Sequence, residues 1–165
     1  MKKVVKFGGS SLASAEQFKK VGDIIRADKS RRYVVPSAPG KRSSSDTKVT
    51  DMLYSCYNLA IREKKFTSLL DEIHARYNEI IDGLNLELSL DHEFDMIREN
   101  FGKKIGRDYA ASRGEYLNGI IMANYLGFCF IDAAEVIRFH EDGSLDDEKT
   151  NELLSLRLEG EEFAV

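Results

Sequence analysis

Apolar residues in the first part of the chain change from a strand pattern to a helical pattern and back again. A short β-branched and aromatic run at residues 4–7 is typical of a buried strand. Residues 16–27 then carry apolar side chains at helical spacing, and residues 32–36 (RYVVP) predict a second strand. Two strands joined by a helix form a βαβ unit, so the pattern predicts a parallel sheet.

The middle of the chain has a helical pattern almost throughout. Four segments each carry apolar residues on one stripe: 47–64, 67–82, 91–103 and 107–126. Gly83 and Gly127 follow the second and the fourth segment, and glycine just past the last periodic residue is a common helix terminator. We interpret the stripes as core faces and the charged residues between them as solvated faces.

The last part of the chain returns to a mixed pattern. Residues 128–131 predict a third strand, and a short helical piece, a polar turn around Gly143 and a helix over 149–158 follow. Residues 163–165 begin a fourth strand. Because a domain rarely ends at the start of a buried strand, we expect a chain truncated at its C-terminal side. The predicted class is α/β, a three-layer α/β/α sandwich with a mainly parallel sheet.

Composition narrows the possible functions. The 165 residues are 42% hydrophobic and 32% charged, as in a globular domain, and the net charge of −4 argues against a general nucleic-acid binder. No apolar run approaches the roughly 18 residues of a membrane helix. With no secretory signal pattern at the start, we expect a cytoplasmic protein. Cys56 and Cys129 are interpreted as reduced, buried thiols, and the three histidines lack zinc-ligand spacing.

The turn after the first predicted strand has the composition of an anion site. Gly8 and Gly9 are followed by Ser10, and a helix begins soon after, with Ser14 and Gln17 spaced as a capping box. Glycines let backbone N–H groups approach phosphate oxygens, and a helix end adds partial positive charge. Lys6 would bring a full positive charge to the same place. The alternative is an ordinary strand-to-turn connection.

The loop over residues 37–46 contains a second sequence that suggests phosphate binding. Its PGKRSS is similar to part of a Walker A loop, but that motif requires a glycine five residues before Gly40, where Val35 stands. A P-loop is therefore excluded.

Residues 112–115 (SRGE) lie within the long predicted helix over 107–126. Ser112 and Glu115 are three residues apart, so their side chains are expected on the same side of the helix. Gly114 between them costs about 1 kcal/mol relative to alanine, which suggests close approach by another backbone or a ligand. Helix-on-helix packing is the alternative explanation.

Several of these segments, in this order, resemble the amino-terminal part of aspartokinases, a branch of the amino acid kinase family. The resemblance covers essentially the whole chain and rests on five motifs: KFGGSS at 6–11, VVPSAPGK at 34–41, TDML at 50–53, SRGE at 112–115 and FID at 130–132. Residues 1–165 would then be the substrate-side part of the catalytic domain.

The resemblance implies transfer of the ATP γ-phosphoryl group to the side-chain carboxylate of L-aspartate. It implies a catalytic Lys6 and a phosphate-binding segment comprising Lys6, Phe7, Gly8, Gly9 and Ser10. It also implies substrate contacts from Ser37, Thr50, Ser112 and Glu115, with Glu115 pairing the substrate ammonium. Mg²⁺ would bridge phosphate oxygens without a dedicated protein site, and the complete enzyme is expected to be a homo-oligomer.

The sequence also departs from the family pattern. The later glycine-rich Gly/Ser-Arg-Gly-Gly-Ser-Asp loop of the nucleotide-binding half and the ligand-sensing domains are absent from these residues. We therefore expect the isolated chain to be inactive. Two alternatives stay open: another carboxylate or carbamate kinase of the same superfamily, and a non-catalytic ligand-binding or dimerisation module.

Overall fold

A parallel strand pair lies at the centre of the structure, a computed structural model that describes all of residues 1–165. Strands β1 (Lys3–Phe7) and β2 (Arg31–Pro36) are joined by the short 3₁₀ helix η1 (Gly9–Leu12) and by α1 (Ala15–Arg26). The two strands pair in parallel, with Val5 opposite Val34 and Phe7 opposite Pro36. The predicted βαβ unit is confirmed, and the Ser14 hydroxyl caps α1 by accepting from the Gln17 amide at 3.5 Å.

The end of the chain continues this sheet beside β2. Ala164 forms parallel bridges with Tyr33 of β2 and with Cys129. The amide of Val34 donates to the Ala164 carbonyl at 2.9 Å, and that of Ile131 donates to Val165 at 2.8 Å. The predicted strands at 128–131 and 163–165 therefore exist only as short bridged segments. Residues 163–165 lie between β2 and residues 128–131.

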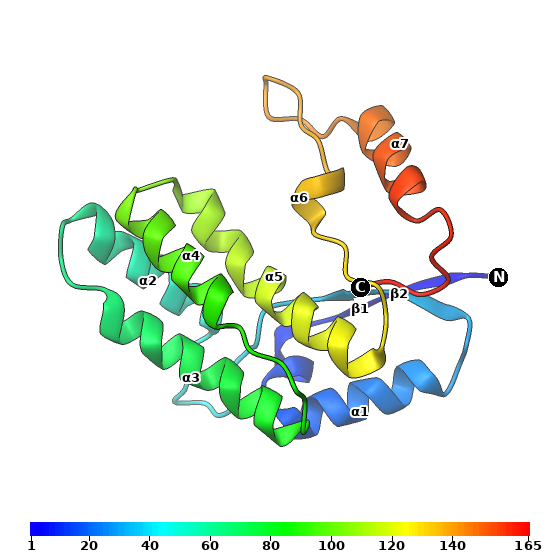
Figure 1. The fold of residues 1–165 in the computed structure, drawn as a ribbon, viewed down its shortest axis with the longest axis horizontal. Coiled ribbons are helices and arrows are strands. Elements are labelled where there is room, and N and C mark those ends of the chain that lie inside the picture. The colour runs from blue at the N-terminus through cyan, green and yellow to red at the C-terminus, as the bar shows by residue number, and fades with distance from the viewer.

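Four helices form the body on one side of this sheet (Figure 1). They are α2 (Val49–Ile61), α3 (Thr67–Gly83), α4 (Asp91–Gly102) and α5 (Arg107–Leu126). All four were predicted, and α5 ends where the sequence predicts, because Gly127 adopts the left-handed conformation with φ 71°. Their apolar stripes meet α1 in one core, so the stripes are core faces as expected.

Gly83 was predicted to terminate the helix over 67–82. The helix does end at Gly83, but this glycine does not adopt the left-handed conformation of a helix terminator. Gly83 is the last helical residue of α3, and the left-handed position falls on Asn85, with φ 54°. A Cβ atom on Gly83 would lie 2.5 Å from the Cβ of Ala15. Glycine is therefore needed here for the close approach of α1 and α3.

The helices α6 (Ala133–Val136) and α7 (Asp147–Arg157) lie on the other side of the strands from α1 (Figure 1). They are joined by the predicted polar turn, in which Gly143 has φ 83°. Helices thus lie on both sides of a parallel sheet, which confirms the α/β class. None of the helices combines the length and the apolar character that crossing a membrane requires.

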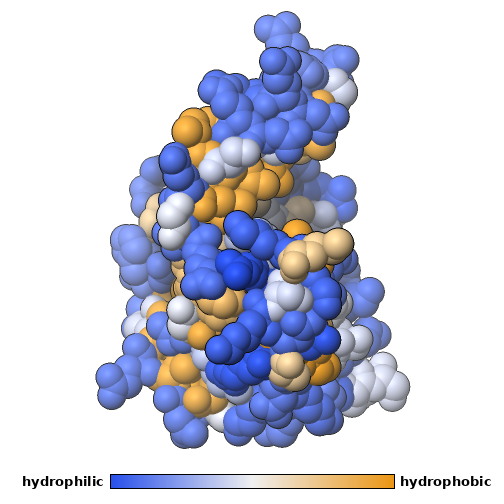
Figure 2. Space-filling model, turned by 90° about the vertical axis from the view of Figure 1, so that its right-hand side faces the viewer, coloured by the Kyte–Doolittle hydropathy of each residue, from blue (hydrophilic) through white to orange (hydrophobic).

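The two faces of β1 and β2 differ in exposure. Val5 and Phe7 pack against the core with Val34, whereas Val4 is 68% exposed and Val35 48% exposed on the opposite face. Figure 2 shows apolar surface on this side, below the hydrophilic lobe at the top of the view.

Both cysteines are free, as predicted. Cys56 is buried in the core, and burial raises the pKa of its thiol to about 12. Cys129 is only half-buried, which corrects the prediction that both thiols are buried. It lies at the sheet edge, where its Sγ is 3.5 Å from an Arg157 guanidinium nitrogen.

Candidate functional site

A cavity of about 500 Å³ opens where the chain leaves the carboxyl ends of β1 and β2. Ligands of open α/β sheets commonly bind outside these strand ends. The cavity is lined by both strand-end loops, the start of α2 and one residue of α5: Gly9, Ser10, Ser37, Ala38, Pro39, Gly40, Lys41, Lys48, Thr50 and Glu115.

The two strand-end loops contact each other through glycine backbone. The amide of Gly40 donates to the carbonyl oxygen of Gly9 at 2.8 Å. A Cβ atom on Gly40 would lie 2.5 Å from the Gly9 carbonyl carbon, and one on Gly9 would lie 2.7 Å from the Ala38 oxygen. Real side chains do not tolerate such distances, so the contact requires glycine at both positions.

The loop after β1 presents three successive backbone donors. The amides of Gly8, Gly9 and Ser10 donate to no backbone or side-chain acceptor in the chain. Gly8 has open space around it, with no atom within 4 Å of an added Cβ. Consecutive free N–H groups at a strand-to-helix turn are suited to binding the oxygens of a phosphate.

Lys6 and Phe7 lie at the end of β1 and differ in their surroundings. Lys6 is exposed and forms no ion pair, and strand alternation places it on the sheet face of Val4. Phe7 is half-buried against the core, and its carbonyl accepts from the Ser37 amide at 3.0 Å. Neither residue lines the cavity, so Phe7 supports the loops through its backbone.

Glu115 reaches the cavity from α5. Its Oε1 atom accepts from the Ala38 amide at 3.3 Å. The neighbouring Gly114 explains this approach, since a Cβ there would lie 2.7 Å from the Cβ of Ala38 and 3.8 Å from Thr50 Oγ1. The mid-helix glycine therefore leaves room for Ala38 of the loop after β2 and for the start of α2, and Thr50 and Glu115 both line the cavity.

Ser112, by contrast, is not brought to the cavity. Its hydroxyl donates to the Tyr109 carbonyl at 2.9 Å and accepts from the Arg113 guanidinium at 3.0 and 3.2 Å. The Arg113 guanidinium stacks between the rings of Tyr109 and Tyr116. A substrate contact from Ser112 stays a prediction, and in this structure its hydroxyl is engaged on the outer side of α5.

Two residues that support the site were not singled out from the sequence. The buried amide of Asn118 donates to the Ser37 carbonyl at 2.7 Å, and the buried Tyr77 hydroxyl donates to the Gly114 carbonyl at 2.8 Å. Burial, followed by the charge of Glu115, raises the pKa of Tyr77 well above its usual value. A signal was available for Asn118, since it is an amide flanked by apolar residues and glycine in the α5 sequence.

Lys41 and Lys48 were also missed, because loop residues with positive charge are common on surfaces. Both line the cavity with Glu115, so the site presents two cations and one anion. Such an arrangement is suited to a ligand that carries separate negative groups and one ammonium group.

The chain is similar in sequence to known proteins. The model of the amino acid kinase family matches residues 1–161. Aspartokinase 3 of Bacillus subtilis is 46% identical over 88 residues, which make up 53% of this chain and 19% of that protein.

Two solved structures have the same fold. The Clostridium acetobutylicum aspartate kinase, described as an allosteric enzyme, matches all of this chain with a TM-score of 0.95 and 45% identity. Escherichia coli aspartokinase III, solved with aspartate and ADP, matches 99% of the chain with a TM-score of 0.73 and 20% identity, which shows the fold alone. The chain spans only 38% of the clostridial enzyme and 40% of the E. coli enzyme.

Proposed function

Because the chain belongs to the amino acid kinase family, we propose that residues 1–165 form the amino-terminal, substrate-side part of an aspartokinase catalytic domain. The complete protein then transfers the γ-phosphoryl group of ATP to the side-chain carboxylate of L-aspartate and releases aspartyl phosphate. The names of the bacterial relatives support this substrate.

The observation that carries the proposal is the row of three free amides beside a cavity with mixed charge. Gly8, Gly9 and Ser10 supply donors for phosphate oxygens, and Lys6 stands unpaired on the strand just before them. Glu115 faces the same space from α5. A phosphate donor and an amino acid acceptor can thus be held side by side.

The chemistry of this transfer requires positioning and charge neutralisation. The side-chain carboxyl of aspartate has a reference pKa of about 3.9, so it is ionised near neutral pH and requires no general base. The two reactants are both anions, and charge shifts toward the leaving phosphate in the transition state. Lys6 and the loop amides would stabilise that charge.

The acceptor amino acid is recognised by opposite charges at its two ends. Glu115 pairs the α-ammonium group, and its position is fixed by the Ala38 amide at 3.3 Å. Thr50 and Ser37 donate hydroxyl hydrogen bonds, and Lys48 lies beside Thr50 at the start of α2. This division of charge favours an amino acid over carbamate, which has no ammonium group.

Magnesium is expected to bridge the phosphate oxygens and to neutralise their charge. No group of three histidine, cysteine, aspartate or glutamate side chains in the chain is placed to hold a metal ion. In this proposal the metal would be held by the phosphate oxygens of ATP. We further propose that the isolated 165 residues are inactive and that the complete enzyme is a homo-oligomer.

The experiment that tests the proposal is substrate profiling of the complete protein that carries these residues. The purified protein is incubated with Mg-ATP and with aspartate, glutamate, acetylglutamate or carbamate, and hydroxylamine is added to trap acyl phosphates. We expect a hydroxamate with aspartate alone. Trapped product with a different acceptor would assign another kinase of the family, and ligand binding without ADP release would favour a non-catalytic module.

A further inference from the structure

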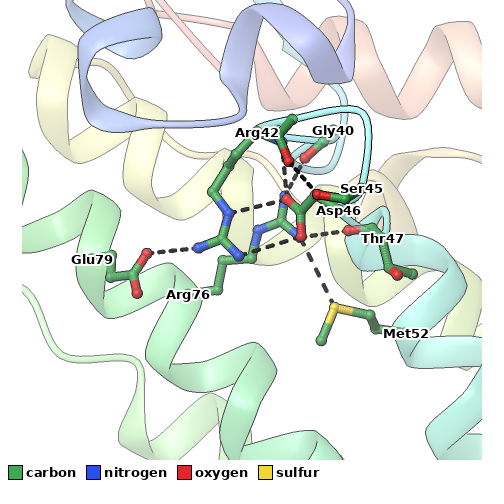
Figure 3. A network of polar contacts seen from close by, with 9 residues as sticks. Gly40, Arg42, Ser45, Asp46, Thr47, Met52, Arg76 and Glu79 are labelled. Carbon is green, nitrogen blue, oxygen red and sulfur yellow. Dashed lines mark hydrogen bonds and ion pairs between the residues drawn. The ribbon is translucent and has the colours of Figure 1, made fainter.

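Arg76 of α3 is a buried charged side chain that the proposed chemistry does not use. It is only 3% exposed, and it lies behind the loop that follows β2. Its guanidinium donates to the carbonyl oxygens of Gly40 and Thr47, the latter at 2.6 Å, and pairs with Asp46 at 3.1 Å (Figure 3). One side chain thus contacts the residue before the segment 41–46, the last residue of that segment and the residue after it.

A second layer of contacts holds the same segment from the solvent side. Arg42 donates to Asp46 through its backbone amide at 2.9 Å and its Nε at 3.0 Å, and it reaches Glu79 of α3 at 2.9 Å (Figure 3). These hydrogen bonds, together with the charge of Arg76, hold the pKa of Asp46 well below its usual range. Asp46 is therefore the ionised counterion of Arg76 at neutral pH.

The residues that Arg76 holds are direct neighbours of the site. Gly40 donates to Gly9 at 2.8 Å in the loop with the free amides. Lys41 and Lys48, which line the cavity, each directly follow a residue whose carbonyl accepts from Arg76. A movement of either carbonyl would move the lysine attached to it.

A contribution to stability does not by itself explain why an arginine is buried at position 76. A buried ion pair often contributes no more stability than apolar residues of the same volume, because desolvating the charges is costly. The Nε atom of Arg76 is also buried without a partner, which adds a further cost. What an apolar residue cannot do is donate to two carbonyls and a carboxylate at once, and the planar guanidinium does so.

We propose that Arg76 is a positioning residue that fixes the loop between β2 and α2, and with it Lys41, Lys48 and the Gly9–Gly40 contact, for binding of the acceptor amino acid. This inference rests on the proposed function. Lysine in place of Arg76 keeps the charge but, as a single ammonium group, cannot hold the two carbonyls in the same planar arrangement.

The test compares Arg76→Lys and Arg76→Met with the unchanged complete protein. We expect the KM for aspartate to rise on the order of tenfold or more while kcat changes much less, because the loop no longer holds the binding groups in place. Arg98→Met is the matched control, because Arg98 makes two exposed ion pairs, with Asp71 and Asp95, and no recorded hydrogen bond or ion pair to the loop. Ile97→Ala should destabilise the core, because Ile97 of α4 is buried, and the KM for aspartate should stay unchanged.

Amide hydrogen exchange gives a readout that does not depend on activity. In Arg76→Lys the amides of Gly40, Arg42 and Val49 should exchange on the order of tenfold faster, while those in the middle of α5 keep their rates. Unchanged loop exchange overturns the proposal, and so does faster exchange with an unchanged KM for aspartate. If the unchanged protein does not phosphorylate aspartate, the proposed function fails, and the exchange rates still decide whether Arg76 holds the loop.

Discussion

Gly40 donates its amide hydrogen to the carbonyl oxygen of Gly9 at 2.8 Å, and this bond joins the loops that follow two neighbouring strands. The contact leaves no room for a side chain, since a Cβ on Gly40 would lie 2.5 Å from the Gly9 carbonyl carbon. Each loop thereby fixes the position of the other, and both line one cavity.

Gly40→Ala should therefore separate the two loops. The neighbouring atoms belong to backbone and cannot rotate away, so we expect a loss of about 1–3 kcal/mol in the free energy of unfolding, as for other overpacked sites. Urea denaturation measures this change. Gly102→Ala is a suitable control, because no atom lies within 4 Å of the added Cβ. Equal stability of both variants would contradict the close contact.

Gly8→Ala should leave stability unchanged but weaken the binding of ATP. Gly8 has φ −76° and open space around its Cα, so alanine fits and stability should stay within about 0.5 kcal/mol. A phosphate that approaches the amides would meet the new methyl group, and the KM for ATP in the complete enzyme should rise. Unchanged ATP kinetics would count against phosphate binding at this turn.

Lys6→Ala should reduce transfer strongly without affecting folding. The side chain is exposed and unpaired, so its removal costs little stability. If Lys6 stabilises the transferring phosphate, kcat should fall by about 100-fold or more. Lys20→Ala, an equally exposed lysine on α1, serves as the control in the same steady-state assay. A turnover rate that survives in Lys6→Ala would rule out the assignment.

Glu115→Gln separates charge from hydrogen bonding. Glutamine can still accept from the Ala38 amide, so the loop contact at 3.3 Å should persist. The negative charge proposed to pair the substrate ammonium is lost, and the KM for aspartate should rise by about tenfold or more. The melting temperature and the KM for ATP are the parallel measurements that should stay constant.

Cys56 should be unreactive until the protein unfolds. Burial raises its pKa to about 12, so at pH 8 a thiol reagent should modify Cys129 alone in the folded chain. The folded thiol holds its proton over a pH range in which the unfolded one, with a pKa of about 8.5, loses it. The contribution of Cys56 to the free energy of unfolding is therefore fully present below about pH 8.5 and is lost progressively as the pH rises toward 12. Cys56→Ala should reduce that alkaline decline in urea titrations.

Local patterns were sufficient to predict the elements that carry the site. The strand–glycine–serine run at the N-terminus and the helix from Arg107 to Leu126 are encoded by neighbouring residues, and both occur as predicted. Thr50 and Glu115 were singled out by the resemblance alone, and in the structure both line the same cavity.

Long-range contacts account for what the sequence did not reveal. Arg76 was counted among the polar residues of an amphipathic helix, and only the folded loop shows that its guanidinium is buried on backbone carbonyls. The Ser112 hydroxyl accepts from Arg113, whose guanidinium lies over the rings of two tyrosines, and helical spacing alone does not indicate this contact. Gly83 resembled a helix terminator because its contact, Ala15, is far away in sequence.

The position of Ala164 between Tyr33 and Cys129 has a consequence for the order of folding. Residues 163–165 join the two parts of the sheet, and they are synthesised after both of their partner segments, which are distant in sequence. The βαβ unit and the helical body can form from local contacts, whereas pairing of the third and fourth segments of the sheet must await residues 163–165. Until then β2 presents an open edge, which makes this strand the one most in need of protection during synthesis.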